Sequence, residues 1–352
     1  MKKNIKKILK VLGIFLLIIL VALIAYLIYL FASYHRIPDN QDLKIEKTSD
    51  GTAAADTLTT EKEYSALTYN VGFGAYTPDF SFFMDGGKSS WAKSKESVES
   101  DIQGAGELVA SKDPDFALIQ EVDLNSTRSY HVDEYSILKD TIPSYNTVFA
   151  QNYDSAFLFY PFTQPHGRSR SGLALFSKYP VTDSLRRSFP ISTSFSKFFD
   201  LDRCYSISRV PVDNGKELAI FLLHMSAYGN SDAIREAQIR MLSADMEKEY
   251  EAGNYVLCGG DFNHDLKASE KNAENCESWA YPFPREELPE HFSFCLDNLS
   301  DSEKDALWDS ARNADMEYVP GVTYTVTLDG FITSDNIECT EYENINTGYS
   351  YS

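Results

Sequence analysis

The 352-residue sequence lacks the closely paired cysteines of a zinc-binding module. The five cysteines are Cys204, Cys258, Cys276, Cys295 and Cys339. They form no C-x-x-C pair, which argues against a zinc knuckle. An odd number in an exported domain leaves at least one thiol unpaired. Cys276 and Cys295 could bridge the loop between them, which sequence alone does not decide. No internal repeat is present.

Positive charge is also scarce. The chain has 32 Lys and Arg against 52 Asp and Glu, a formal net charge of −20. Five of the basic residues precede the first apolar run: Lys2, Lys3, Lys6, Lys7 and Lys10. The remainder of the chain is therefore still more acidic and repels nucleic-acid backbones at long range. This argues against tight, non-specific DNA binding through a broad basic face. It does not exclude a small cationic or metal-filled cleft.

The longest apolar run is Val11–Ala32, which contains no charged residue. As a helix it is about 33 Å long, enough to cross a bilayer. It is longer than a usual signal-peptide apolar region and ends without a small-residue cleavage site. We expect a basic cytoplasmic tail (1–10), a single transmembrane helix (11–32), a polar linker (33–63) and an extracytoplasmic body at the cell membrane. A buried helix and a cleaved signal are the alternatives.

Residues 64–352 predict one domain in which strand-like and helix-like segments alternate. The expected helices are Lys95–Ser111 and Ser231–Glu251, and an irregular segment spans Lys267–Ser302. The expected strands are Ser65–Val71, Asp115–Gln120, Tyr145–Gln151, Gly172–Ser177, Arg203–Val212, Leu218–His224, Tyr255–Cys258, Thr323–Thr327 and Asp329–Thr333.

Polar residues stand where several of these strands end: Asn70, Glu121, His224, Asp261, Asn263 and Asp329. Strand ends cluster in space when strands share a packed pair of sheets, so these side chains predict a site. In the stretch Y-V-L-C-G-G-D-F-N-H-D, two glycines are expected to end the strand. The two-residue spacing of Asp261 and Asn263 would then place both side chains on one face of an extended segment. A strand followed by a capped turn is the simpler alternative.

The residue types of this set suit phosphate and metal chemistry. Asn70, Glu121 and Asp261 offer oxygen ligands, which favour Mg²⁺ or Ca²⁺ over zinc. Beside carboxylates, His224 is a candidate acid/base or phosphate donor, although a lone histidine there is more often structural. Arg168 and Arg170, in the loop G-R-S-R-S-G, could clamp a phosphate or could be solvated.

A set of short motifs in a fixed order resembles the endonuclease/exonuclease/phosphatase superfamily, which includes deoxyribonucleases, abasic-site endonucleases, sphingomyelinases and inositol-polyphosphate phosphatases. The motifs are T-Y-N (68–70), L-I-Q-E-V-D (118–123), S-G-L-A-L-F-S-K-Y-P-V (171–181), L-L-H-M-S (222–226), G-G-D-F-N (259–263) and L-D-G-F-I-T-S (328–334). The resemblance implies an α/β (α+β) fold, a four-layered sandwich of two packed mixed β-sheets flanked by helices and here preceded by the transmembrane helix.

The resemblance also implies roles for individual residues. Glu121 matches the family's metal-binding glutamate and Asn70 its neighbouring asparagine, with Mg²⁺, or Mn²⁺ or Ca²⁺, as the cofactor. Asp261 matches the aspartate that activates water, and Asn263 the amide that contacts the scissile phosphate. His224 matches a histidine of deoxyribonuclease-like members, and Asp329 the aspartate near the catalytic histidine. The implied chemistry is metal-assisted water attack on a phosphoester.

One departure concerns the family's S-D-H motif, which should come about twenty-five residues after Asp329. Ser334-Asp335-Asn336 lies too early, because it belongs to the preceding strand motif. We expect Ser352 to be the serine of S-D-H, with the domain incomplete at its C-terminus. Losing a general acid/base typically costs about 10²–10⁴-fold in rate.

Two functions compete on this basis. The first is a membrane-anchored, metal-dependent phosphodiesterase, nuclease or phosphatase; the second is a catalytically impaired surface module that binds a phosphorylated ligand or partner. Candidate substrates are nucleic acid, a lipid head group and a small phosphoester, and no obligate protein partner is evident. The aromatic stretches Phe73–Phe83 and Phe157–Phe162 could line a lipid- or base-binding cleft or could be packed loop residues.

Overall fold

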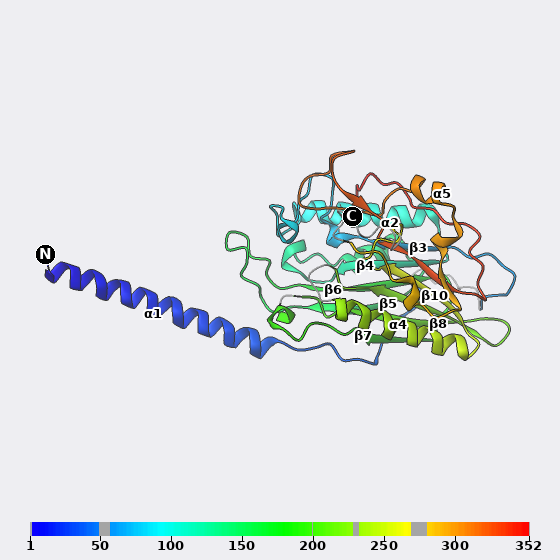
Figure 1. Ribbon diagram of the computed structural model, residues 1–352, viewed down its shortest axis with the longest axis horizontal. Helices are drawn as coiled ribbons and strands as arrows, with labels where there is room; N and C mark the ends of the chain where they lie inside the picture. Colours follow the sequence, from blue (N-terminus) through cyan, green and yellow to red (C-terminus); the bar gives the residue numbers. More distant parts are fainter. Residues whose placement is uncertain (1, 49–56, 199, 228–231, 269–279, 352) are drawn as a thin grey trace.

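Two β-sheets stacked face to face form the centre of the protein in the computed structural model, which describes residues 2–48, 57–198, 200–227, 232–268 and 280–351 (Figure 1). The larger sheet has the strand order β1-β7-β8-β9-β10-β14-β11. Its strands are β1 Gln41–Asp42, β7 Asp183–Ser188, β8 Cys204–Pro211, β9 Glu217–His224, β10 Tyr255–Asp261, β14 Asp329–Ser334 and β11 Phe292–Phe294.

The smaller sheet has the order β2-β5-β6-β4-β3. Its strands are β2 Ile45–Glu46, β5 Asn146–Asp154, β6 Arg170–Ser177, β4 Phe116–Asp123 and β3 Ala66–Asn70. Both sheets are mixed, because β9 and β10 are parallel in one and β3 and β4 in the other, while the remaining neighbours are antiparallel. A separate two-stranded sheet joins β12 (Ala311–Arg312) to β13 (Thr325–Val326).

Helices cover the outer faces of both sheets. Helices α2 (Lys95–Lys112) and α3 (Glu134–Thr141) lie over the smaller sheet, and α4 (Asp232–Glu251) lies over the larger one, at opposite sides of Figure 1. A short helix, α5, spans Asp301–Ala306. The result is the four-layered α/β sandwich of two packed mixed sheets that the sequence predicts, and that prediction is confirmed.

The alternation of side chains along β9 shows why its apolar run forms a central strand. Leu218, Ile220 and Leu222 pack between the two sheets, against β4 and β6 residues of the smaller sheet. The intervening Ala219, Phe221 and Leu223 pack beneath α4. A strand that is buried on both faces needs apolar residues at every position, since successive side chains point to opposite faces.

Several elements lie outside the sequence prediction. Strand β7 reads D-S-L-R-R-S, and β1, β2, α3 and α5 are short, so none carries a clear apolar period. The segment Lys267–Ser302, expected to be irregular, contains β11, which pairs with β14. The strand expected at Thr323–Thr327 is shorter, Thr325–Val326, and belongs to the separate sheet, where it pairs with β12.

The segment predicted as a linker adds strands to the sandwich in its described part. Gln41 pairs with Arg186 on β7, and Ile45 pairs with Val148 on β5. Arg36 places a guanidinium nitrogen 2.6 Å from the carboxylate of Asp202. Backbone pairing at two sheet edges holds this polar segment, although it has no apolar periodicity.

Gly259 and Gly260 continue β10 to Asp261, so the prediction that they end the strand is wrong. Glycine is required there because neighbouring strands press against the backbone. A Cβ on Gly259 would lie 2.5 Å from the ring of Phe331, and one on Gly260 would lie 2.1 Å from the carbonyl oxygen of Leu223. Gly260 also has a φ of +143°, which L side chains rarely adopt.

Helix α1 spans Lys2–Ser33 and is the one helix in the described chain that is long and apolar enough to cross a membrane (Figure 1). Its first turns project from the sandwich, and Leu30 near its end is buried against the domain. Of the two cysteines that could form a bridge, Cys276 lies outside the described residues. Cys295 instead contacts Cys339, which comes after β14.

We predict that Gly260→Ala destabilises the protein by about 3 kcal/mol or more, because the new methyl group clashes with backbone and the φ is unfavourable. Urea unfolding of the full chain measures the change. Gly215→Ala is the matched control: its φ is +80° and no atom of the described residues lies within 4 Å of the added Cβ, so it should cost about 1 kcal/mol. Equal losses in the two variants would contradict the close approach of β9 to Gly260.

Candidate active site

Three of the predicted site residues lie side by side across the larger sheet. Asp261 at the end of β10 is in register with His224 at the end of β9 and with Asp329 at the start of β14. The nearest distance from His224 Nε2 to Asp261 Oδ2 is 3.7 Å. The strand-end pattern in the sequence therefore does mark residues that the fold brings together.

Asn70 connects these residues to the smaller sheet. Its Nδ2 donates to Asp261 Oδ2 at 2.9 Å and to Glu121 Oε1 at 3.3 Å, while its Oδ1 accepts the N–H of Gly72 at 3.0 Å. One amide nitrogen thus serves two carboxylates that come from different sheets. Two carboxylate oxygens that converge on one donor define a position where positive charge is favoured.

The backbone at Glu121 explains how its side chain reaches this point. β4 continues to Asp123, but its register with β6 shifts between Ile119 and Val122. Glu121 lies within this irregularity and has a φ of +57°. A bulge of this kind redirects one side chain of a buried strand, which the alternation in the sequence does not reveal.

Asn263 reaches the cluster by a turn, so the prediction that it shares one face of an extended segment with Asp261 is wrong. Its φ is +51°, and its backbone N–H donates to Asp261 Oδ1 at 2.8 Å. Its side-chain Nδ2 donates to the carbonyl of Met225, just after β9, at 2.9 Å. An aspartate that accepts the N–H two residues on forms a common local turn, the capped-turn alternative that the sequence left open.

Burial governs the charges of the cluster. Burial, reinforced by Glu121, raises the pKa of Asp261 to about 6, although the donors Asn70 and Asn263 oppose this change. Burial and then the charge of Asp261 raise the pKa of Asp329 well above its usual value. Burial, with Arg203 and Arg128 adding to it, lowers the pKa of His224 well below its usual value, so the imidazole is neutral at pH 7.

Asp329 and His224 each keep one buried polar atom without a hydrogen-bond partner. Ser310 Oγ donates to Asp329 Oδ2 at 2.7 Å, but within the described part of the chain Asp329 Oδ1 has no partner, and neither has Nδ1 of His224. An unpaired buried polar atom costs free energy that is recovered when a ligand or another group supplies the partner.

Arg203 is a residue of the cluster that sequence reasoning missed. It lies just before β8, is 6% exposed, and its Nε and Nη1 have no hydrogen-bond partner among the described residues. Its charge lowers the pKa values of both His224 and Asp261. A buried guanidinium with free donors beside these groups is suited to an anion. The only signal in the sequence is a basic residue at the start of a strand, which is too common to select it.

Of the two arginines that the sequence does single out, Arg168 lies two residues before β6 and Arg170 is its first residue. Arg168 is exposed and pairs with Asp154 at 2.8 Å. Arg170 Nε is buried and has no hydrogen-bond partner in the part of the chain that the structure describes. Among the described residues, no hydrogen bond joins either guanidinium to Asp261 or Glu121. Their predicted contact with phosphate stays a prediction.

The donor set fits a hard divalent cation. No group of three or more His, Cys, Asp or Glu side chains forms a metal cluster in the described part of the chain. The convergence of Glu121 and Asp261 on the amide nitrogen of Asn70 nevertheless brings two carboxylates together. This suits Mg²⁺, which usually takes one or two carboxylates and completes its shell with water and substrate phosphate.

Comparison with known proteins assigns the chain to a family. The sequence signature of the Endonuclease/Exonuclease/phosphatase family matches residues 67–292. The chain belongs to this family. The matched range includes all the site residues above except Asp329.

Individual relatives are distant. An inositol phosphosphingolipids phospholipase C from Schizosaccharomyces pombe is 24% identical over 54% of this chain and 45% of that protein, so the chain spans less than half the length of this curated relative. The structure of an endonuclease/exonuclease/phosphatase from Beutenbergia cavernae aligns with a TM-score of 0.53 and 12% identity, covering 77% of this chain and 64% of that one. A mannosyl-6-phosphatase from Bacteroides thetaiotaomicron aligns with a TM-score of 0.48 and 16% identity over 77% and 85%. The Beutenbergia cavernae structure shares the fold.

We predict that Asp261 makes the stability of the metal-free protein fall as pH rises. Its folded pKa, about 6, lies above the ordinary value of 3.8. The stabilising contribution is therefore complete below pH 4 and is lost as pH rises through 6, by about 3 kcal/mol at most. Urea unfolding in EDTA from pH 4 to pH 7 should show this slope relative to Asp261→Asn. Parallel pH profiles for the two proteins would contradict the buried, strained carboxylate.

Proposed function

We propose that this protein is a membrane-anchored, extracytoplasmic, metal-dependent phosphoester hydrolase. The observation that carries the proposal is the convergence of Glu121 and Asp261, from two different sheets, on the amide of Asn70. Membership of the Endonuclease/Exonuclease/phosphatase family supports it, as does a phospholipase C among the relatives.

Each residue of the cluster has a chemical task in this proposal. Glu121 would hold the divalent cation, and Asn70 would join it once its amide turned the oxygen that accepts the Gly72 N–H here toward the carboxylates. When bound, the cation supplies polarisation of the phosphoryl oxygens. Asp261, ionised above pH 6, accepts the proton of the attacking water. Asn263 has a second amide N–H beyond the one given to Met225, and this can donate to a phosphoryl oxygen.

Three further groups surround the phosphoryl position. Arg203 contributes the two free guanidinium donors to the phosphate. His224, neutral at pH 7, donates from one ring nitrogen, and Asp329 favours its protonated form, so it can hold a proton beside Asp261.

The topology is part of the proposal. α1 has the length and composition to span a bilayer, and its five N-terminal lysines favour a cytoplasmic N-terminus. The domain after the helix then lies outside the cytoplasm. Its acidic surface disfavours polymeric DNA at long range and leaves lipid head groups and small phosphoesters as substrates.

The test is hydrolysis of bis-p-nitrophenyl phosphate by the full chain in detergent with Mg²⁺. Asp261→Asn should lower the rate by about 10²–10⁴-fold, the usual cost of losing a general base. Glu121→Gln should raise the Mg²⁺ concentration needed for half-maximal rate, and EDTA should abolish activity. The control is Asp183→Asn, an exposed carboxylate on β7 that pairs with Arg209.

Two outcomes would count against the proposal. Activity that survives Asp261→Asn would remove its residue basis. A complete lack of activity, with retained binding of a phosphoester, would favour the alternative of a catalytically impaired ligand-binding module.

A further inference from the structure

The last turns of α1 are attached to the domain through two loops. The hydroxyl of Tyr26 donates to the carbonyl of Phe157 at 3.0 Å, and the hydroxyl of Tyr29 accepts the N–H of the same residue at 2.9 Å. The ring of Phe31 packs on that of Phe198 with centroids 4.7 Å apart. Hydrogen bonds and ring packing therefore hold the C-terminal end of α1 against residues 157–159 and 195–198.

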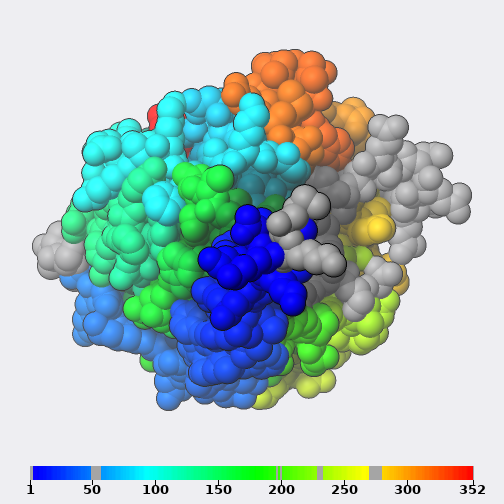
Figure 2. Space-filling model, turned by 90° about the vertical axis from the view of Figure 1, so that its left-hand side faces the viewer, coloured from blue at the N-terminus to red at the C-terminus, as the bar shows by residue number. Residues whose placement is uncertain are grey.

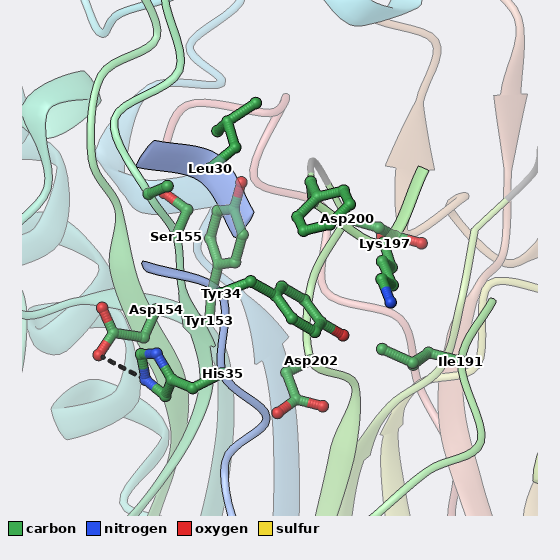
Figure 3. A pocket seen from close by; sticks show the side chains of 12 residues that line it. Leu30, Tyr34, His35, Tyr153, Asp154, Ser155, Ile191, Lys197, Asp200 and Asp202 are labelled. Carbon is green, nitrogen blue, oxygen red and sulfur yellow. Dashed lines mark ion pairs between the residues drawn. The ribbon is translucent and has the colours of Figure 1, made fainter. Parts of the chain in front are cut away.

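Figure 3 shows this junction from close by. Leu30 and Tyr34 of the helix end line a pocket together with Tyr153, Lys197 and Asp202 of the domain. Leu30 is only 1% exposed. The helix end is thus part of the folded domain rather than a free tether.

Exposed aromatic side chains surround the same place. Phe159 and Tyr160 are 50% and 65% exposed, Phe162 is 84% exposed and Phe195 is 51% exposed. We call these four residues the aromatic collar. The ring of Phe159 packs edge-on against that of Tyr26, and the ring centroids of Phe195 and Phe31 are 6.5 Å apart. The collar is therefore continuous with the helix. Figure 2, which looks along α1, shows green segments around the blue helix.

The length of the apolar part of α1 determines how close the collar lies to the membrane. Only Val11–Ala25 is apolar and free of the domain, because Tyr26 already bonds to it. These fifteen residues span about 22 Å as a helix, which is less than the hydrocarbon core of about 30 Å. Tilt shortens the span further. A helix that crosses the bilayer must therefore draw Tyr26–Ala32 and the loops bonded to it into the membrane interface.

Strand register places the candidate site at the same end of the sandwich. Loop 155–169 joins β5 to β6, and Ser171 at the start of β6 pairs with Asp123, two residues after Glu121. Loop 189–203 joins β7 to β8, and Tyr205 near the start of β8 pairs with Leu223, next to His224. The loops that carry the collar therefore border the strand ends that carry the candidate catalytic residues, on the side where α1 leaves the sandwich (Figure 1).

We infer that the collar is a bilayer-contact surface that holds the candidate site against the leaflet into which α1 runs, and that the substrate is the head-group phosphoester of a lipid in that leaflet. The inference deepens the proposed function and rests on it and on the proposed membrane span. Aromatic side chains suit the interface because they join an apolar body to polar surroundings. Lys197, beside Tyr34 and Phe198, adds a positive charge for anionic head groups.

The depth of the collar is tested in the full chain reconstituted in phosphatidylcholine and phosphatidylglycerol vesicles. Phe162→Trp should show blue-shifted emission that brominated lipids quench and aqueous iodide does not, measured against the unsubstituted protein with its three tryptophans. Asp213→Trp is the control, in the β8–β9 turn at the opposite end of the strands. Quenching of both positions by iodide alone overturns the inference, and shielding of Phe162→Trp without bromolipid quenching indicates a protein partner instead.

The substrate class is tested by comparing vesicle lipid with a soluble phosphodiester. Phe162→Ser/Phe195→Ser should lower head-group release from sphingomyelin or phosphatidylglycerol vesicles by about tenfold or more relative to bis-p-nitrophenyl phosphate, because each phenylalanine loses its apolar contact. Asp213→Ser should leave this ratio unchanged. If the protein hydrolyses the soluble ester or DNA but does not hydrolyse the vesicle lipid, the proposed substrate class is overturned and the proposed function stands. If brominated lipids quench Phe162→Trp but no ester is hydrolysed, the proposed function and the substrate class are overturned. The bilayer contact of the collar then still stands.

Discussion

A single side-chain amide joins the two halves of this protein where its chemistry would occur. Asn70 ends a strand of the smaller sheet and bonds both to Glu121 of that sheet and to Asp261 of the larger one. Two carboxylates held close together in a buried place repel each other unless a donor or a cation lies between them. The packing of the two sheets creates this unfavourable arrangement, and the free energy stored in it is available for binding positive charge.

The backbone is adapted to the same end. Gly260 lets β10 approach β9 so closely that Asp261 and His224 fall in register, and the bulge in β4 turns Glu121 toward Asn70. Left-handed φ values at Glu121 and Asn263 place unusual backbone at two of the site residues. Such backbone persists only where the surrounding structure enforces it.

Periodicity and residue type predict the part of this architecture that depends on burial. The apolar run of β9 and the stripe of α4 could be read because their side chains pack on two layers, and the strand ends then identified His224, Asp261 and Asp329. The features that could not be predicted from the sequence depend on which strands pair with one another in the folded protein. The polar strand β7 exists because β8 and β1 hydrogen-bond to it, and β1 converts part of an apparent linker into sheet. Arg203 lies just before β8, and it comes near the site because Tyr205 of β8 pairs with Leu223, next to His224.

The claim that depends most directly on these observations is a shared cation position between Glu121 and Asp261. Crystals of the full chain soaked in Mn²⁺ and measured at the manganese absorption edge would locate the ion. The account predicts an anomalous peak within coordination distance, roughly 2.0–2.6 Å, of a carboxylate oxygen of Glu121 and adjacent to Asp261. Bound manganese confined to other parts of the protein, with Asn70 still bridging the two carboxylates, would contradict it.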